Sequence, residues 1–360
     1  MINKFYLPVL KTKQGEFDGL AILESEVKKS IVPLIEFTKL EFDNAVNTKP
    51  KTIEGHLTNI CKRISAKWGS SNGFIDPYLI YDTLPGGETC FEYIYNKLVP
   101  NNVIPLPIVQ LSTPDNLITN IREIISLYKI EEVGIRVFIP NIVSPNFLED
   151  IRQLLENVRI KPENCHLILD LNSADFSNTD DFSDSIIDQL KTFPYLESWK
   201  SFTICGGSFP ATNRIKVGVN EIPRGEWIFF NKLIQKQQRE SFERPINFGD
   251  YGIVAPGHFE YDPVKMDRSA NIRYTHNDIW YVIKGKSLKT TGHGQYFALA
   301  KEVSDSTYFL GETFCEGDAH LKKCSLRQTS TGNPTVWNKI GFNHHFSKVI
   351  ADLSANYFAA

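Results

Sequence analysis

The sequence has 360 residues, of which 42% are hydrophobic and 22% are charged, and its formal net charge is −3. A chain of this length and composition buries a large core, which excludes a disordered protein and predicts one large α/β domain or two domains of average size. The small net charge gives no global attraction to polyanions or acidic membranes, so we expect no binding to extended duplex nucleic acid.

The cysteines and the apolar stretches bear on the compartment. The six cysteines form no CxxC pair, which is the spacing typical of structural zinc sites. Several lie in apolar runs, which predicts buried, reduced thiols and a cytoplasmic protein. No stretch resembles a signal peptide, and none offers about 18 uncharged apolar residues, so we expect no membrane span.

Short apolar, β-branched runs alternate with segments of helical periodicity. The runs that predict strands are residues 5–11, 31–37, 73–80, 103–112, 133–139, 165–172, 201–208 and 248–254. The segments that predict helices are residues 19–30, 53–68, 88–98, 116–129, 146–158, 183–193 and 226–238. This alternation implies parallel strands with helical crossovers, and eight strands at this spacing predict a (β/α)8 barrel of the TIM type.

A doubly wound open sheet is the alternative fold. Its dinucleotide fingerprint is missing, because no predicted strand leads into GxGxxG. Five prolines inside predicted strands weaken the strand pattern, because proline removes a ladder donor; they are Pro8, Pro33, Pro77, Pro105 and Pro107. We predict the barrel.

After the eighth run the pattern changes to turn residues. Residues 272–285 predict a β-hairpin, residues 296–303 a helix and residues 344–358 a closing helix. We therefore predict barrel strands and helices over 1–254, an insertion over 255–340 that lies on the C-terminal face of the barrel, and a closing helix over 341–360.

Polar residues stand at or near the C-terminal end of every predicted strand. They are Lys11, Glu36, Asp76, Gln110, Arg136, Asp170, Ser208 and Asp250. Because these ends meet on one face of a barrel, we predict a shared polar pocket. Arg136 is embedded, since apolar residues continue the run beyond it; the alternative is that it pairs with Glu36 or Asp170 as a closed plug of charges.

Carboxylates of this set predict a metal site. Glu36, Asp170 and Asp250 are candidate ligands of Mg²⁺ or Mn²⁺, which prefer oxygen donors, and candidate catalytic residues. The spacing of these residues carries no local metal signature.

The stretch SFTICGGSFP (201–210) ends the seventh strand, where barrels often bind phosphate. We predict that the backbone at Gly206, Gly207 and Ser208 cradles an anion, with Lys11 and Arg136 neutralising phosphate charge. An ordinary turn is the alternative.

The insertion and the closing helix supply further candidates. Arg273 and Tyr274, with Trp280 and Tyr281, are predicted to clamp an anion or stack on a ring; a small hydrophobic core is the alternative. His344 and His345 stand at the start of the predicted closing helix and are candidates for a general acid or base, with helix capping as the alternative. No GxSxG or HExxH motif is present.

Eight stretches taken together resemble the phage beta protein family, which is named after a protein of a T-even phage. They are YLPVLKTKQGE (6–16), VPLIEF (32–37), PIVQLS (107–112), ICGGSFP (204–210), IPRGEW (222–227), FGDYG (248–252), NIRYT (271–275) and NHH (343–345). The resemblance implies an intracellular bacterial or phage protein linked to phage–host conflict. It identifies no catalytic residue, and it adds Arg224, Glu226 and Trp227 to the residues of interest.

Three functions remain open from the sequence. The first is metal-assisted hydrolysis of a phosphoester in a phosphorylated or nucleotide-like ligand. The second is a non-catalytic recognition module of an antiphage defence system, which senses a phage protein or metabolite. The third is a glycoside hydrolase that uses two of the carboxylates, with Trp280 or Trp337 as a sugar platform.

Overall fold

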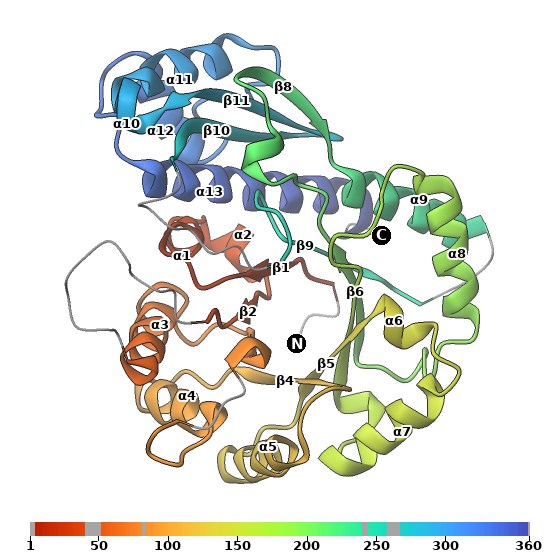
Figure 1. Ribbon diagram of the computed structural model, residues 1–360. Helices are drawn as coiled ribbons and strands as arrows, with labels where there is room; N and C mark the ends of the chain where they lie inside the picture. Colours follow the sequence, from red (N-terminus) through yellow and green to blue (C-terminus); the bar gives the residue numbers. More distant parts are fainter. Residues whose placement is uncertain (1–3, 40–51, 81–83, 240–243, 258–266, 359–360) are drawn as a thin grey trace.

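A closed barrel of eight parallel strands forms the larger part of the molecule, as the sequence predicts (Figure 1). The computed structural model describes residues 4–39, 52–80, 84–239, 244–257 and 267–358. The barrel strands are β1 (Leu7–Leu10), β2 (Leu34–Glu36), β3 (Phe74–Asp76), β4 (Leu106–Gln110), β5 (Val133–Phe138), β6 (Cys165–Asp170), β7 (Ser201–Gly206) and β9 (Asn247–Asp250). Strand β9 pairs with both β7 and β1, which closes the ring.

Helices surround this ring (Figure 1). They are α1 (Gln14–Ala21), α2 (Ser25–Lys29), α3 (Ile53–Lys67), α4 (Cys90–Leu98), α5 (Asp115–Tyr128), α6 (Ile139–Ile142), α7 (Phe147–Val158), α8 (Thr179–Lys191), α9 (Gly225–Arg239) and α13 (Pro334–Leu353). The single helix predicted over 19–30 is wrong, because two short helices occupy this region. Helix α1 begins earlier because the Glu16 carboxylate accepts the backbone N–H of Lys13 and caps its first turn.

A layer of apolar side chains lies inside the barrel, on the amino-terminal side of the strands' carboxyl ends. These side chains come from alternate positions of the strands and include those of Leu7, Leu34, Phe74 and Ile108. Gly134 makes room for them, because a Cβ there would lie 2.2 Å from Cδ1 of Ile108. Of the five prolines inside predicted strands, three fall just outside the observed ones, and only Pro8 and Pro107 interrupt a ladder. The proline objection to the barrel therefore has little weight.

A second, antiparallel sheet accompanies the barrel, in the order β10-β11-β8. The predicted hairpin is confirmed as β10 (Ser269–His276) and β11 (Ile279–Ser287). The third strand, β8 (Gly218–Pro223), comes from the loop between β7 and α9 and is absent from the prediction. Its side chains are mostly exposed, so it lacks the apolar run by which the barrel strands are recognised.

Two further helices accompany the second sheet. Helices α11 (Tyr296–Asp305) and α12 (Glu316–Ser325) pack with it and with α13 around a core of their own. Short helical turns connect these parts: α10 (Leu288–Thr291), η5 (His293–Gln295) and, after α13, η6 (Ser354–Phe358). The remaining turns are η1 (Tyr78–Ile80), η2 (Val99–Asn101), η3 (Pro162–Asn164) and η4 (Thr212–Arg214).

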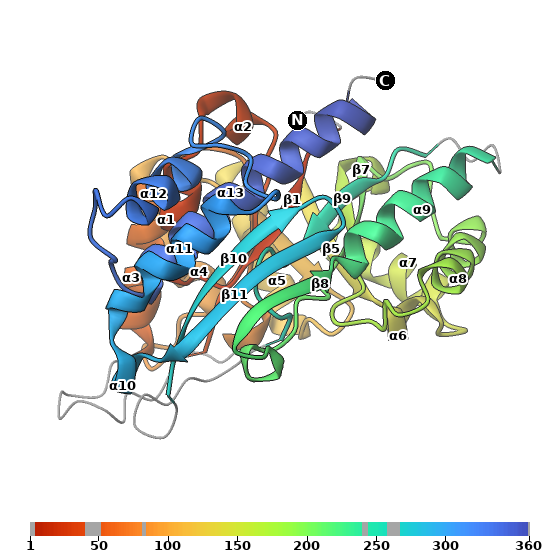
Figure 2. The ribbon, with the colours of Figure 1, turned by 90° about the horizontal axis from the view of Figure 1, so that it is seen from above.

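The second sheet lies beside the barrel (Figure 1) and not on its C-terminal face, where the insertion over 255–340 is predicted to lie. Residues 258–266 of the predicted insertion lie outside the described residues, and residues 255 and 257 contact Lys11 at the carboxyl end of the barrel. Helix α13 packs on α1 with one side and on β10 with another, so it stands between barrel and sheet (Figures 1 and 2). Helix α13 begins at Pro334, with Asn333 as its capping residue. The predicted boundary at residue 341 thus falls inside a helix. No helix of the described residues is long and apolar enough to cross a membrane.

Candidate functional site

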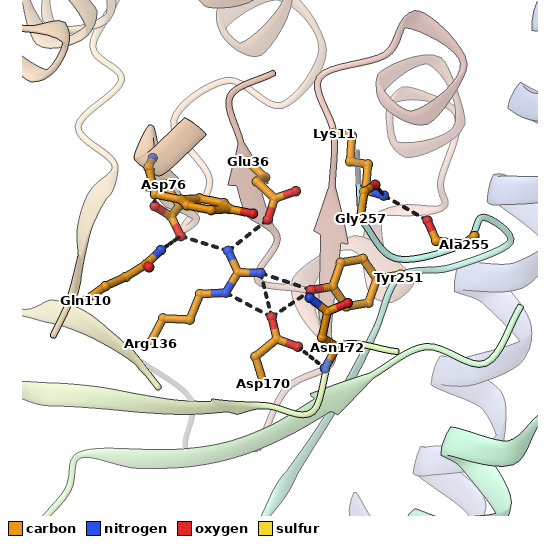
Figure 3. Close-up of polar contacts among 11 residues, drawn as sticks. Lys11, Glu36, Asp76, Gln110, Arg136, Asp170, Asn172, Tyr251, Ala255 and Gly257 are labelled. Carbon is orange, nitrogen blue, oxygen red and sulfur yellow. Dashed lines mark hydrogen bonds and ion pairs between the residues drawn. The ribbon is translucent and has the colours of Figure 1, made fainter. Parts of the chain in front are cut away.

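A layer of polar side chains fills the carboxyl end of the barrel (Figure 3). Successive side chains of a strand point to opposite faces, so only alternate residues reach the interior. Six of the eight predicted strand-end residues do so: Lys11, Glu36, Asp76, Gln110, Arg136 and Asp170. Tyr251, just after β9, joins them from above the apolar layer. We call Glu36, Asp76, Gln110, Arg136, Asp170 and Tyr251 the barrel network.

Arg136 is the centre of the barrel network. Its Nε lies 2.9 Å and its Nη2 2.5 Å from Oδ2 of Asp170, and Nη2 also donates to the Tyr251 hydroxyl at 3.0 Å. Its Nη1 donates to Oε1 of Glu36 at 2.9 Å and to Oδ2 of Asp76 at 2.8 Å. A guanidinium has five N–H donors, and all five are used inside the protein.

Burial and charge shape the titration of these groups. Burial opposes the charged form of Arg136, but the carboxylates around it, with Asp170 first, keep its pKa above the ordinary value. Burial also raises the pKa of Asp76, although Arg136 opposes this shift. Lys11, whose Nζ donates to the carbonyl oxygens of Ala255 and Gly257, has a pKa lowered by burial. The structure therefore has the charge plug that the sequence leaves open as an alternative.

One carboxylate oxygen of the barrel network has no partner among the described residues. The layer brings three carboxyl groups, those of Glu36, Asp76 and Asp170, together with two basic side chains, those of Arg136 and Lys11. Both oxygens of Asp76 and of Asp170 accept hydrogen bonds. Oε2 of Glu36 accepts none from the described residues and points away from Arg136 in Figure 3. Among the three carboxylates of this layer, and within the described residues, Glu36 is the one that keeps an oxygen without a hydrogen-bond partner.

Asp250 does not belong to the barrel network, which corrects its prediction as a ligand beside Glu36 and Asp170. It is the next residue, Tyr251, that points inward, because the direction of side chains alternates. Asp250 accepts the hydroxyl of Tyr6 at 2.5 Å and lies 2.9 Å from Nε2 of His345. We call Tyr6, Asp250, Thr275 and His345 the helix network, since it connects the barrel wall to α13.

The two histidines lie in the middle of α13 and not at its start, and both are buried. Nδ1 of His345 lies 2.8 Å from the Thr275 hydroxyl, and burial lowers the pKa of His345. His344 lies 3.1 Å from Oδ2 of Asp318; burial opposes its protonation, but Asp318 outweighs burial and raises the pKa to about 10. No described contact joins either histidine to the barrel network, so the predicted proton shuttle at that face is not present.

The predicted anion cradle holds a carboxylate of the protein itself. The backbone N–H and the hydroxyl of Ser208 donate to Oε2 of Glu226, at 3.1 and 2.6 Å. The N–H of Gly207 donates to the carbonyl oxygen of Asn172. Gly206 belongs to β7, where a Cβ would lie 2.9 Å from the Phe176 ring. The glycines thus serve close packing, and Glu226 occupies the place proposed for a ligand.

Of the IPRGEW residues, Arg224 and Glu226 form a buried pair that is incompletely satisfied. Nη1 of Arg224 donates to the carbonyl oxygen of Asn277, whereas its Nε and Nη2 have no hydrogen-bond partner among the described residues. The same is true of Oε1 of Glu226, which lies 3.9 Å from Nε of Arg224. Burial raises the pKa of Glu226 to about 7. The guanidinium of Arg224 lies 5.1 Å from the ring centre of Trp227.

The predicted clamp of the insertion is occupied by internal contacts. Arg273 donates to the Ile253 carbonyl oxygen at 2.8 Å and to the Thr212 hydroxyl at 3.1 Å. Tyr274 stacks on His344, with ring centres 3.8 Å apart. Trp280 and Trp337 are 1% and 4% exposed, so neither offers a sugar platform. The hydrophobic-core alternative describes this region.

Strand order and the buried polar layer define this protein as an α/β barrel of the (β/α)8 class with an appended antiparallel sheet. The family model described as Beta protein matches residues 6–351. The chain therefore belongs to the Beta protein family, which confirms the resemblance seen in the sequence.

Comparisons with individual proteins add little. A search of curated proteins finds no significant match. Among solved structures, the chain is similar to a D-psicose 3-epimerase in the presence of D-fructose, with 11% sequence identity and a TM-score of 0.30. The similarity covers 68% of this chain and 84% of that chain.

Proposed function

We propose that this chain is a non-catalytic recognition module of an antiphage defence system. The observation that carries the proposal is the saturation of Arg136, whose five N–H groups all bind acceptors of the protein. A phosphate group needs free donors, and the carboxylates around Arg136 repel it. The link to defence inside the bacterial cell follows from the resemblance to the phage beta protein family. With the barrel end filled by its own side chains, a phage protein is the expected target.

Ligand-dependent stabilisation tests the non-catalytic part of the proposal. A ligand present at 100 times its Kd stabilises a native protein by about 2.7 kcal/mol, which raises the melting temperature by several degrees. We expect no shift with Mg²⁺, Mn²⁺, nucleotides, sugar phosphates or sugars. A shift that is present in the wild type and lost in Glu36→Gln would contradict the proposal.

A phage-plating assay tests the defence part. Cells that carry the chain with its native gene neighbours are challenged with phage, and the efficiency of plating is compared with that of cells that lack the chain. We expect protection, and we expect Glu36→Gln to retain it, because a recognition module does not need a reactive carboxylate. If the intact chain gives no protection, it has no defence role. If a stable Glu36→Gln variant loses protection, the barrel end is functional.

Metal-assisted phosphoester hydrolysis is the second candidate, and Glu36 is the observation that favours it. Its Oε2, which has no partner among the described residues, and the three carboxyl groups at the barrel end match the preference of Mg²⁺ and Mn²⁺ for oxygen donors. A phosphorylated or nucleotide-like ligand would then need Arg136 to exchange partners. A Mg²⁺-dependent rise in melting temperature, abolished by Glu36→Gln and retained in Glu54→Gln, would support this candidate over the first.

A further inference from the structure

Three metal-binding side chains converge away from the barrel network. The Sγ of Cys315, a carboxylate oxygen of Asp318 and a ring nitrogen of His344 all lie within 4.8 Å of one another, and all three residues are buried. Ligands of a tetrahedral Zn²⁺ with bonds of about 2.0 to 2.3 Å are about 3.3 to 3.8 Å apart. The three atoms therefore reach such an ion with movements of about 1 Å. We propose that Cys315, Asp318 and His344 bind a Zn²⁺ ion.

The backbone holds these residues in place. Cys315 caps α12 and Asp318 lies in its first turn, so a spacing of three residues puts both side chains on one face. His344 lies on α13. Gly317 joins the two helices closely: its N–H donates to Oδ1 of Asn343 at 2.8 Å, and a Cβ there would lie 2.6 Å from the Ile340 carbonyl oxygen. The ligands thus sit on two helices with a fixed separation.

The orientation of His344 suits a metal ligand. Its Nε2 lies 2.8 Å from the carbonyl oxygen of Thr275, which only accepts, so Nε2 carries the hydrogen. In the neutral ring Nδ1 then holds the lone pair, and Nδ1 is the atom that faces Asp318. Metal-binding histidines typically donate their second N–H to a carbonyl or carboxylate in this way. The stacked ring of Tyr274 fixes the imidazole plane.

An independent observation points to a missing partner. Oδ1 of Asp318 is buried and has no hydrogen-bond partner in the part of the chain that the structure describes, and the residue is 0% exposed. An unsatisfied carboxylate oxygen in such a place costs on the order of 1 to 3 kcal/mol or more. A Zn²⁺ ion would satisfy it and take the place of the proton between Asp318 and His344.

Charge and donor type select the metal. A Cys thiolate and an Asp carboxylate balance the two positive charges of the ion, which leaves a neutral buried site. Sulfur and imidazole nitrogen are donors that Zn²⁺ accepts and that Mg²⁺ and Ca²⁺ avoid. The Cys-x-x-Asp spacing also explains why a search of the sequence for CxxC pairs does not find this group.

Metal titration of the untagged, full-length chain tests the proposal. After dialysis against a chelator, the chain is titrated with Zn²⁺ in competition with a chromophoric chelator, and separately with Co²⁺. We expect one Zn²⁺ per chain and, with Co²⁺, a thiolate-to-metal charge-transfer band in the near ultraviolet. Absence of either from the wild-type chain overturns the proposal, whatever the variants do.

Two cysteine variants, one at each end of α12, assign the site. Cys324, which is also buried and lies in the last turn of α12, is not part of the cluster and provides the matched control. Because loss of groups around a metal ligand already weakens binding 10- to 100-fold, we expect Cys315→Ala to weaken Zn²⁺ binding by at least about 100-fold. Cys324→Ala is expected to bind as the wild type does. Equal binding by Cys315→Ala and the wild type, or equal loss in both variants, would overturn the assignment.

Discussion

The neighbouring residues Asp250 and Tyr251 belong to two different buried polar networks. Tyr251 points into the barrel and joins a permanent cation, Arg136, with three carboxylates around it. Asp250 points outward and joins His345, whose pKa is lowered by burial, through a carboxylate, two hydroxyls and an imidazole. One residue of difference along the strand therefore separates a charged interior from a contact between barrel wall and helix.

The two networks are stabilised by different interactions. The barrel network depends on ionic hydrogen bonds, so loss of its one central cation leaves several buried charges uncompensated. The helix network is a chain of single hydrogen bonds between elements, so each of its links is worth less and is replaceable by itself.

Replacement of Arg136 has the largest expected effect. Arg136→Met removes the cation while Glu36, Asp76 and Asp170 stay buried, so we expect a loss of at least about 3 to 5 kcal/mol in the free energy of unfolding. Urea denaturation measures it. The control is Arg152→Met, where the arginine pairs with Glu149 and Glu156 but is half exposed; we expect a loss of less than about 1 kcal/mol. Equal losses in the two variants would contradict a buried, charged barrel network.

Glu226, close to Asp250, gives a pH dependence. Burial raises the pKa of Glu226 from 4.5 to about 7, so the folded state holds its proton where the unfolded state has lost it. This contribution to stability is present below pH 4.5 and is lost as the pH rises toward 7. Glutamine does not titrate, so the stability of Glu226→Gln relative to the wild type should rise by about 2 to 3 kcal/mol between pH 5 and 8.

The difference in stability between Glu226→Gln and the wild type isolates the contribution of Glu226. Burial also raises the pKa of Glu16 to about 7, and its contribution is the same in both chains. Urea denaturation at several pH values gives the required free energies. A difference that does not change with pH would show that Glu226 has an ordinary pKa.

A double-mutant cycle tests whether the two networks are separate. We expect Asp250→Asn to cost about 1.5 to 3 kcal/mol, because the side chain accepts hydrogen bonds from Tyr6 and Gly252 as a charged group. Combined with Glu36→Gln, the cost should be additive within about 0.5 kcal/mol, since the residues share no partner. A coupling of more than about 1 kcal/mol would favour the single site expected from the sequence.

Glu36→Gln alone has the smallest expected effect. Only Oε1 is bonded to Arg136, and Oε2 has no partner among the described residues, so an amide retains the main contact. We expect a change of less than about 1.5 kcal/mol in the free energy of unfolding, measured by urea denaturation. A loss as large as that of Arg136→Met would show that Glu36 is an integral part of the plug and not its open position.

The sequence predicts the barrel because barrel strands are buried on both faces and read as continuous apolar runs. Strand β8 is missed by the same criterion, because its residues are largely exposed and form no continuous apolar run. Arg136 is predictable as an embedded cation because apolar residues follow it. Its pairing with Glu36 and Asp170 follows from the shared end of parallel strands, although the choice between a pocket and a plug needs the geometry.

The direction of Asp250 is not predictable, because β9 has no alternating pattern. Its residues Asn247 to Asp250 include Gly249, which points inward without a side chain, since a Cβ there would lie 2.5 Å from Cβ of Cys205. Because glycine has no side chain, a glycine at an inward position removes the alternation of apolar and polar residues from which the two faces of a strand are predicted. The anion cradle predicted at Ser208 is wrong for another reason. The residue that occupies it, Glu226, is 18 residues later in the sequence and comes close to Ser208 only in the folded chain.

The contacts of helix α13 determine which parts of the chain pack together last. It packs against α1, near the start of the chain, and against β10 of the second sheet. Nascent domains generally fold as units while the ribosome is still elongating. Here α1 lacks the helix that packs against it until residues 334–353 have been synthesised, so the docking of barrel and sheet comes late in folding.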